Sequence, residues 1–262
     1  MIRGVALSPA IALVVVCIAS IASSHTHGAD SRKSGFDFMS PATQAMQKDD
    51  SQNPAMLWVQ DGEALWNRVV GDAGKSCAGC HGDAKTSMKG VAARYPSFDT
   101  LSKQLVTLSQ RIDLCRTRNQ KSGSLKPESE ALLGIEAYVA LQSRGMPVAR
   151  NDDPRLAVHV ERGEKLFRQR IGQLDLSCAQ CHDERAGEKR AGSTIPQAHP
   201  MGYPIYRLEW QAMGSLQRRL RNCLTGVRSE AYLFGAIELT ELELYLNRRA
   251  AGLPMETPAV RP

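Results

Sequence analysis

The sequence predicts an all-α fold made of two tandem domains that are related by internal duplication. Residues 62–81 align without a gap with residues 163–182, and nine of the twenty positions are identical. Farther along, Arg111 and Cys115 recur with the same spacing 108 positions later. In both copies apolar residues repeat at intervals of three and four, which is the pattern of a helix with one buried face.

Both aligned segments end in the motif Cys-x-x-Cys-His. Its residues are Cys77, Cys80 and His81 in the first copy and Cys178, Cys181 and His182 in the second. The motif is typical of c-type haem attachment, in which the thiols form thioether bonds to the porphyrin and the imidazole ligates the iron. A zinc scaffold is the alternative, but a separation of about 100 residues is far beyond zinc-ligand spacing. We expect two covalent haem c groups per chain.

Each copy is expected to contain a helix before the motif, a middle helix and a closing helix, which is the order of a cytochrome c-like domain. One face of the first middle helix carries Leu101, Leu105, Leu108, Ile112 and Cys115. The first closing helix runs from about residue 130 to 144, and a Gly-x-Pro stop signal follows each closing helix. A longer loop is expected in the second copy, within residues 184–206.

These patterns divide the chain into four segments. Residues 1–29 resemble an export signal with cleavage at about 22–29, because Arg3 precedes an apolar run too short for a membrane span. The remaining segments are an N-terminal arm at 30–55, a domain with haem 1 at 56–150 and a domain with haem 2 at 155–262. We expect a periplasmic protein. Its net charge of +6 is dispersed, which favours a solvated basic surface over nucleic-acid binding.

Cys115 and Cys223 remain after the four thioether cysteines and Cys17 of the signal segment are assigned. They occupy equivalent places in the two copies, so we expect each to be the second axial ligand of its own haem iron. A disulfide between them is the alternative in an oxidising compartment. Methionine ligation is another, and the candidates are Met88, Met146, Met201 and Met213. None of these has a methionine counterpart in the other copy.

Arg219 lies four residues before Cys223, on the same face of the second middle helix. A guanidinium there could bind an oxyanion through paired donors and favour the thiolate. Arg218 and Arg221 are better explained as solvated charges. Arg111 has the same relation to Cys115, so spacing alone does not decide which haem is catalytic.

The two motifs, together with the segments Arg-Ile-Asp-Leu-Cys-Arg at 111–116 and Arg-Arg-Leu-Arg-Asn-Cys at 218–223, resemble the SoxA family over nearly the whole mature chain. That family comprises dihaem cytochrome c subunits of the bacterial sulfur-oxidation system. The resemblance implies His81 and Cys115 as ligands of the first iron, and His182 and Cys223 as ligands of the second. It also implies a Cys223 that can carry an extra sulfur, a substrate-binding Arg219 and a further arginine at Arg248 or Arg249.

The reaction implied by the resemblance is that of an L-cysteine S-thiosulfotransferase. Thiosulfate is joined to a cysteine of the carrier SoxY, within SoxYZ, and two electrons leave through haem to the cytochrome SoxX. Cys223 would be the catalytic sulfur nucleophile. A periplasmic dihaem electron carrier is the main alternative and predicts methionine ligands. A dihaem peroxidase would need an open iron position, which Cys115 and Cys223 would fill.

Overall fold

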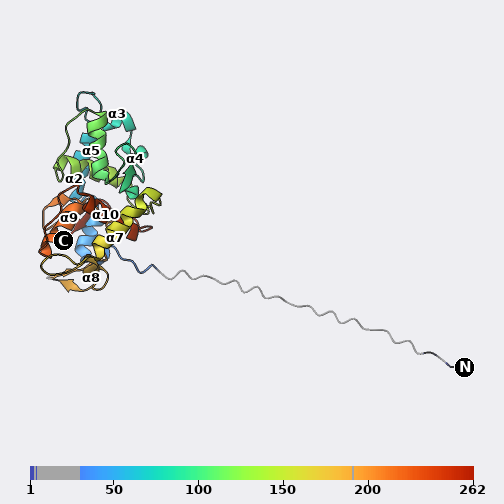
Figure 1. The fold of residues 1–262 in the computed structure, drawn as a ribbon. Coiled ribbons are helices and arrows are strands. Elements are labelled where there is room, and N and C mark those ends of the chain that lie inside the picture. The colour runs from blue at the N-terminus through green and yellow to red at the C-terminus, as the bar shows by residue number, and fades with distance from the viewer. Residues whose placement is uncertain (3, 5–29, 191) are drawn as a thin grey trace. The chain divides into compact units, whose positions relative to one another are not determined.

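The computed structural model describes residues 1–2, 4, 30–190 and 192–262 of the chain. Residues Arg32–Pro262 form one compact unit (Figure 1). The predicted signal segment, its cleavage site and Cys17 lie outside the described residues. Within the described residues, no helix is long and apolar enough to cross a membrane.

Short to medium-length helices dominate the compact unit (Figure 1). The α-helices are α1 (Pro41–Lys48), α2 (Ala55–Asn67), α3 (Cys77–His81), α4 (Ala84–Ser87), α5 (Leu108–Asn119), α6 (Glu130–Leu141), α7 (Ala157–Arg168), α8 (Cys178–His182), α9 (Leu216–Gly226) and α10 (Ile237–Arg249). Three 3-10 helices add η1 (Gly35–Phe38), η2 (Ala92–Arg94) and η3 (Pro154–Leu156). The predicted helix order is therefore present in both halves.

Two helix pairs cross at glycines. At Gly62 in α2, a Cβ atom would collide with the carbonyl oxygen of Gly134 in α6. At Gly163 in α7, it would collide with the carbonyl oxygen of Glu241 in α10. The absence of a side chain lets the two backbones touch, which fixes where each motif-bearing segment lies against its closing helix.

Short strands accompany the helices, so the fold is mainly helical and has more strand than the sequence predicts. β1 (Ser97–Asp99) pairs antiparallel with β2 (Gln104–Val106), and β5 (Ile205–Arg207) pairs antiparallel with β6 (Ala212–Gly214). β7 (Ala259–Arg261) adds in parallel to β5. The expected longer loop contains the small hairpin of β3 (Lys189–Arg190) and β4 (Ser193–Thr194). Three-residue strands are too short to show an alternating pattern.

The first middle helix begins later than predicted. Thr107 caps α5 by accepting a hydrogen bond from the Gln110 backbone N–H, while the Gln110 side chain accepts one from the Thr107 N–H. This reciprocal cap ends the preceding strand and starts the helix at Leu108. Leu105 therefore lies in β2, and Leu101 is 77% exposed in the hairpin turn. The prediction that both lie on the helix was wrong.

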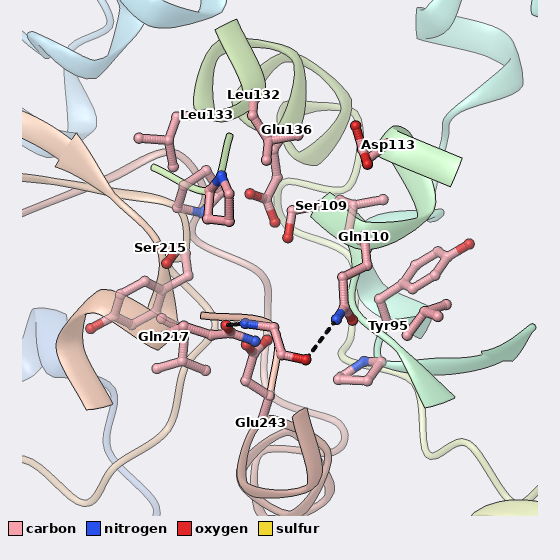
Figure 2. A pocket seen from close by; sticks show the side chains of 18 of the residues that line it. Tyr95, Ser109, Gln110, Asp113, Leu132, Leu133, Glu136, Ser215, Gln217 and Glu243 are labelled. Atoms are coloured by element: carbon pink, nitrogen blue, oxygen red, sulfur yellow. Dashed lines mark hydrogen bonds between the residues drawn. The ribbon is translucent and has the colours of Figure 1, made fainter. Parts of the chain in front are cut away.

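Core packing joins the two halves. The largest core cluster surrounds α2 and α6 and also includes Met201, Met213 and Met255 from the second half. A cavity of about 310 Å³ is lined from both halves, by Glu136 of α6 and Glu243 of α10 among others (Figure 2). Figure 2 shows both carboxyl groups directed into this space.

Candidate functional site

Each haem-attachment motif forms a short capped helix. The Ser76 hydroxyl accepts a hydrogen bond from the Gly79 backbone N–H at 2.9 Å, and the Ser177 hydroxyl accepts one from the Gln180 N–H at 3.2 Å. These caps satisfy N–H groups that the first helical turn leaves unpaired. Each motif therefore holds its two cysteines three positions apart in a defined turn, as attachment to two vinyl groups requires.

The second motif borders a cavity of about 500 Å³. His182, Arg219 and Cys223 all line it, so the structure brings together three residues that the sequence analysis selects. Apolar side chains complete the wall, among them Ile205, Leu216, Leu220 and Leu246. Such a mainly apolar cavity with a few convergent polar groups is typical of a cofactor site.

His182 is oriented as an iron ligand would be. Its Nδ1 lies 2.6 Å from the carbonyl oxygen of Pro196, and because a carbonyl only accepts, Nδ1 carries the proton. The other ring nitrogen, Nε2, is then free to ligate a metal. Cys223 lies near the same imidazole, and both residues line the cavity. The residues present therefore fit a haem c attached at Cys178 and Cys181.

Cys223 is also activated by its surroundings. Burial by itself would raise the pKa of its thiol, but the hydrogen bond with His182 and the charges of Arg219 and Arg207 outweigh burial. The net result is a pKa below the ordinary value of a cysteine. A thiolate is both the nucleophilic and the metal-ligating form of cysteine.

The first motif has a related environment. Gln120 donates a hydrogen bond to the Cys77 sulfur at 3.7 Å, and His81 lies beside Trp66 with ring centroids 5.8 Å apart. Burial raises the pKa of Cys77, and the neighbouring Cys115 raises it further. Cys115 therefore lies near the first motif, where a ligand of the first iron is expected.

The six described cysteines are all free thiols, so Cys115 and Cys223 are not joined in a disulfide. The methionines that the sequence offers as ligands are placed differently. Met201 and Met213 are each 1% exposed and belong to the core cluster around α2 and α6. Met88 packs at the edge of that cluster. Among the residues that line the second cavity the methionine is Met39, from the predicted arm.

The equivalent arginines have unequal partners. Arg111 forms an ion pair with Asp99 at 2.6 Å, so its charge is balanced. Among the described residues, Arg219 forms no ion pair. The two equivalent arginines therefore differ in charge balance, a difference that their spacing from the cysteines does not show.

Arg248 lies away from the cavity, where its guanidinium pairs at 2.5 Å with Asp152, which lies between the two haem-bearing segments of the chain. This placement does not support Arg248 as a substrate ligand. Arg249 pairs at 2.6 Å with Asp183, directly after the second motif, and stacks on Phe167. Neither arginine lines the cavity. Residues 248 and 249 project to different sides of α10, which a sequence match at a helix end does not resolve.

Arg207 is a lining residue that the sequence analysis missed. It lies at the end of β5. The positive charges of Arg207 and Arg219 both lower the pKa of Cys223. A signal was present, because at an offset of 108 Arg207 aligns with Asp99. The strands around Asp99 and Arg207 are too short to give a recognisable sequence pattern. The alignment of the two copies was therefore not extended to these positions.

Comparisons with known proteins agree with this geometry. A family model described as the SoxA/TsdA cytochrome c domain matches residues 61–148. The L-cysteine S-thiosulfotransferase subunit SoxA of Pseudaminobacter salicylatoxidans is 39% identical over 236 residues, which cover 90% of this chain and 82% of the relative. The SoxA subunit of Rhodovulum sulfidophilum is 34% identical, and the alignment covers 88% of this chain and 81% of that relative.

A solved structure extends the likeness to three dimensions. The crystal structure of SoxXA from P. pantotrophus contains a chain that is 33% identical, with a TM-score of 0.85 and coverage of 88% of this chain and 87% of that one. The match spans both motif-bearing halves together with their connecting elements. On this sequence and structural agreement, the chain belongs to the SoxA family of cytochrome c subunits.

Proposed function

We propose that this chain is the catalytic subunit of an L-cysteine S-thiosulfotransferase, which conjugates thiosulfate to a cysteine of the SoxY carrier within SoxYZ. The observation that carries the proposal is one cavity lined by the Cys223 thiol, by His182 and by Arg219, which forms no ion pair with the described residues. The names of the relatives, at 34–39% identity, support the same reaction.

The overall step is an oxidation. A carrier thiol and thiosulfate form a new sulfur–sulfur bond, giving a cysteine S-thiosulfonate, one proton and two electrons. Bound haem supplies the electron acceptor, and the cytochrome SoxX receives the electrons in turn. Cys223 serves as the sulfur nucleophile that can hold an extra sulfur, and Arg219 binds the sulfonate oxygens through its planar donors.

The protein is expected to carry two haem c groups. Cys77 and Cys80 hold the first, with His81 and Cys115 as axial ligands. Cys178 and Cys181 hold the second, with His182 and Cys223 as axial ligands. The half-buried His182 Nδ1–H to Pro196 bond supports this assignment, because it leaves Nε2 available to ligate an iron.

The two haem-bearing halves, 56–150 and 155–262, are proposed to descend from one duplicated unit. The glycine crossings at Gly62 and Gly163 support this, as do the matching hairpins before α5 and α9. We further propose a periplasmic location after removal of residues 1–29 and a heterodimer with SoxX. The match to a chain of a SoxXA crystal structure supports SoxX as the partner.

The test uses haem-loaded protein with SoxX, SoxYZ, thiosulfate and an electron acceptor. Mass spectrometry of SoxY should show one added thiosulfonate. Cys223→Ala should abolish this product while both haems remain attached, because Cys178 and Cys181 form the thioethers of the second haem. Full conjugation by Cys223→Ala would contradict the proposal, and so would a wild-type protein that only passes electrons.

A further inference from the structure

The two hairpins that precede the middle helices have the same register but carry opposite charges at one equivalent position. In the first half Asp99 pairs with Gln104 across β1 and β2, and in the second half Arg207 pairs with Ala212 across β5 and β6. Both positions lie three residues into their strand and at the same offset of 108 as the cysteines. An acidic residue in one half therefore stands where the other half has a basic one.

In the first half the acidic residue closes the site to anions. Asp99 accepts hydrogen bonds from Arg111 at 2.6 Å, from Arg118 at 2.9 Å and from the Ser102 backbone N–H at 2.8 Å. Its side chain is only 3% exposed. The bonds from Ser102, followed by Arg118, hold the pKa of Asp99 well below its usual range, so the carboxylate stays charged. Arg111 already has its anion within the protein.

In the second half the arginine is retained as Arg219, but the aspartate and its other two partners are exchanged. Arg207 replaces Asp99, Trp210 replaces Ser102 and Gly226 replaces Arg118, all at the offset of 108. The Trp210 ring supports the guanidinium of Arg207, which lies 5.1 Å from its centroid. The indole face thus stabilises a cation where the first half uses a hydroxyl to hold a carboxylate.

Arg207 keeps donor capacity for a ligand. Its side chain is 13% exposed and contacts Glu209 at 2.9 Å, but Glu209 is 65% exposed and its attraction is screened by solvent. The Nε of Arg207 is buried and has no hydrogen-bond partner among the described residues. A buried donor without a partner is unfavourable unless a ligand satisfies it.

Three arginines line one cavity, and one of them, Arg261, is already paired with Glu256 at 2.5 Å. Arg207 and Arg219 both line it, and burial followed by the charge of Arg219 lowers the pKa of Arg207. Like charges in a partly desolvated site repel each other, and a bound dianion relieves this repulsion. No aspartate or glutamate is among the residues that line this cavity within the described part of the chain.

We propose that Arg207 is a second anion-binding residue, which acts with Arg219 to bind a sulfonate-bearing dianion, and that the exchange of Asp99 for Arg207 confines this binding to the second half. The inference rests on the proposed function only for naming thiosulfate as that dianion. Binding of a dianion and of a monoanion, measured in the absence of catalytic turnover, therefore tests it.

The experiment measures equilibrium binding to the haem-loaded wild-type protein by calorimetry, with sulfate as an unreactive dianion and nitrate as a monoanion. Arg207→Gln should weaken sulfate binding about tenfold or more, as for loss of one charge-assisted hydrogen bond. Nitrate binding should change less. Arg207→Lys should recover part of the sulfate affinity, because it restores the charge without the planar fork.

Arg207→Asp recreates the arrangement of the first half, where an aspartate pairs with the following arginine. It should fold, as judged by unchanged haem spectra, and should lose sulfate binding. Arg111→Gln is the matched control and should leave sulfate binding unchanged. Unchanged sulfate affinity in Arg207→Gln, or an equal loss in Arg111→Gln, would overturn the proposal.

Steady-state kinetics separate this inference from the proposed function. Arg207→Gln should raise the KM for thiosulfate and leave kcat within about twofold, because it acts on binding of the charged group. If sulfate binding depends on Arg207 but the protein does not conjugate thiosulfate to the carrier, the proposed function is refuted and the anion site is supported. Conjugation with a KM that is indifferent to Arg207→Gln would refute the anion site and retain the function.

Discussion

At the scale of single residues, equivalent side chains in the two halves differ in what balances their charge. Arg111 and Arg219 each lie one helical turn before a cysteine, yet Asp99 neutralises Arg111 and no described carboxylate neutralises Arg219. The helical spacing is a property of sequence, whereas the charge balance depends on a strand residue that is brought in by folding. The two arginines are therefore distinguished by their ion-pair partners and not by their spacing from the cysteines.

Replacing Arg219 by Lys should impair thiosulfate binding. Lysine retains the charge but loses the fork that binds two sulfonate oxygens together, so we expect a loss of roughly 1–3 kcal/mol, mainly in KM. Steady-state rates of SoxY conjugation over a range of thiosulfate concentrations measure it. Arg111→Lys is the control and should leave turnover nearly unchanged. A defect in Arg111→Lys with normal Arg219→Lys would place the chemistry at the first haem.

At the scale of elements, two helix crossings position the haem motifs. α2 meets α6 at Gly62, and α7 meets α10 at Gly163, with Tyr138 and Tyr245 against the respective glycines. Because each glycine touches backbone on the facing helix, a methyl group cannot be accommodated by turning a side chain. The crossings therefore fix the distance between the helix that precedes each motif and the closing helix.

Gly163→Ala should destabilise the fold by about 1–3 kcal/mol or more, because the new methyl group overpacks a backbone contact. Its Cβ would lie 2.8 Å from the Tyr245 Cβ as well as against the Glu241 carbonyl. Urea unfolding followed by circular dichroism measures the change. Gly123→Ala is the control, since a Cβ there meets nothing within 4 Å, and it should shift stability by less than about 0.5 kcal/mol. Equal stability of the two variants would refute close packing at the crossing.

At the scale of the whole molecule, a buried acidic cavity joins the halves. Burial raises the pKa of Glu136 to about 8, with Glu243 and Glu128 contributing, and burial raises that of Glu243 to about 8 as well. One oxygen of Glu136 has no hydrogen-bond partner among the described residues, whereas Gln217 contacts Glu243. The folded protein therefore prefers the protonated carboxyl groups at neutral pH.

This preference makes stability depend on pH. The ordinary pKa of a glutamate is 4.5, so between that value and about 8 the folded state binds more protons than the unfolded state. The free energy of unfolding should then fall as pH rises through this window, by at most about 1.4 kcal/mol per pH unit for each extra proton. Below pH 4.5 this stabilisation is fully present, and above about 8 it is lost.

Glu136→Gln should flatten the fall, because an amide stays neutral at every pH in the window. Chemical unfolding at several pH values between 5 and 8 measures the slope. Glu161→Gln, at an exposed position of α7, is the control and should keep the wild-type slope. A wild-type stability that rises across this range would show that the carboxyl groups are ionised in the folded protein.

Covalent haem content is the second prediction at this scale. Because both motifs are complete and capped, intact-protein mass after export should exceed that of the processed polypeptide by two haems. His81→Ala and His182→Ala should each change the spectrum of one haem only. An excess of one haem would remove the assignment for one motif.

The sequence by itself determined what local pattern and covalent chemistry require. Attachment sites, helix order, glycine stops and the equivalence of Cys115 with Cys223 all follow from residues a few positions apart or from one constant offset. Close spacing along a helix or loop sets these features whatever surrounds them.

Tertiary structure alone decided which of the two equivalent arginines is paired with a carboxylate. It placed Asp99 against Arg111, Arg207 beside Arg219, Met201 and Met213 in the core cluster around α2 and α6, and Arg248 against Asp152. It also joined Glu136 and Glu243 in one cavity. Charge balance and burial depend on contacts between segments far apart in the chain. Three-residue strands contain too few side chains for a sequence pattern to predict those contacts.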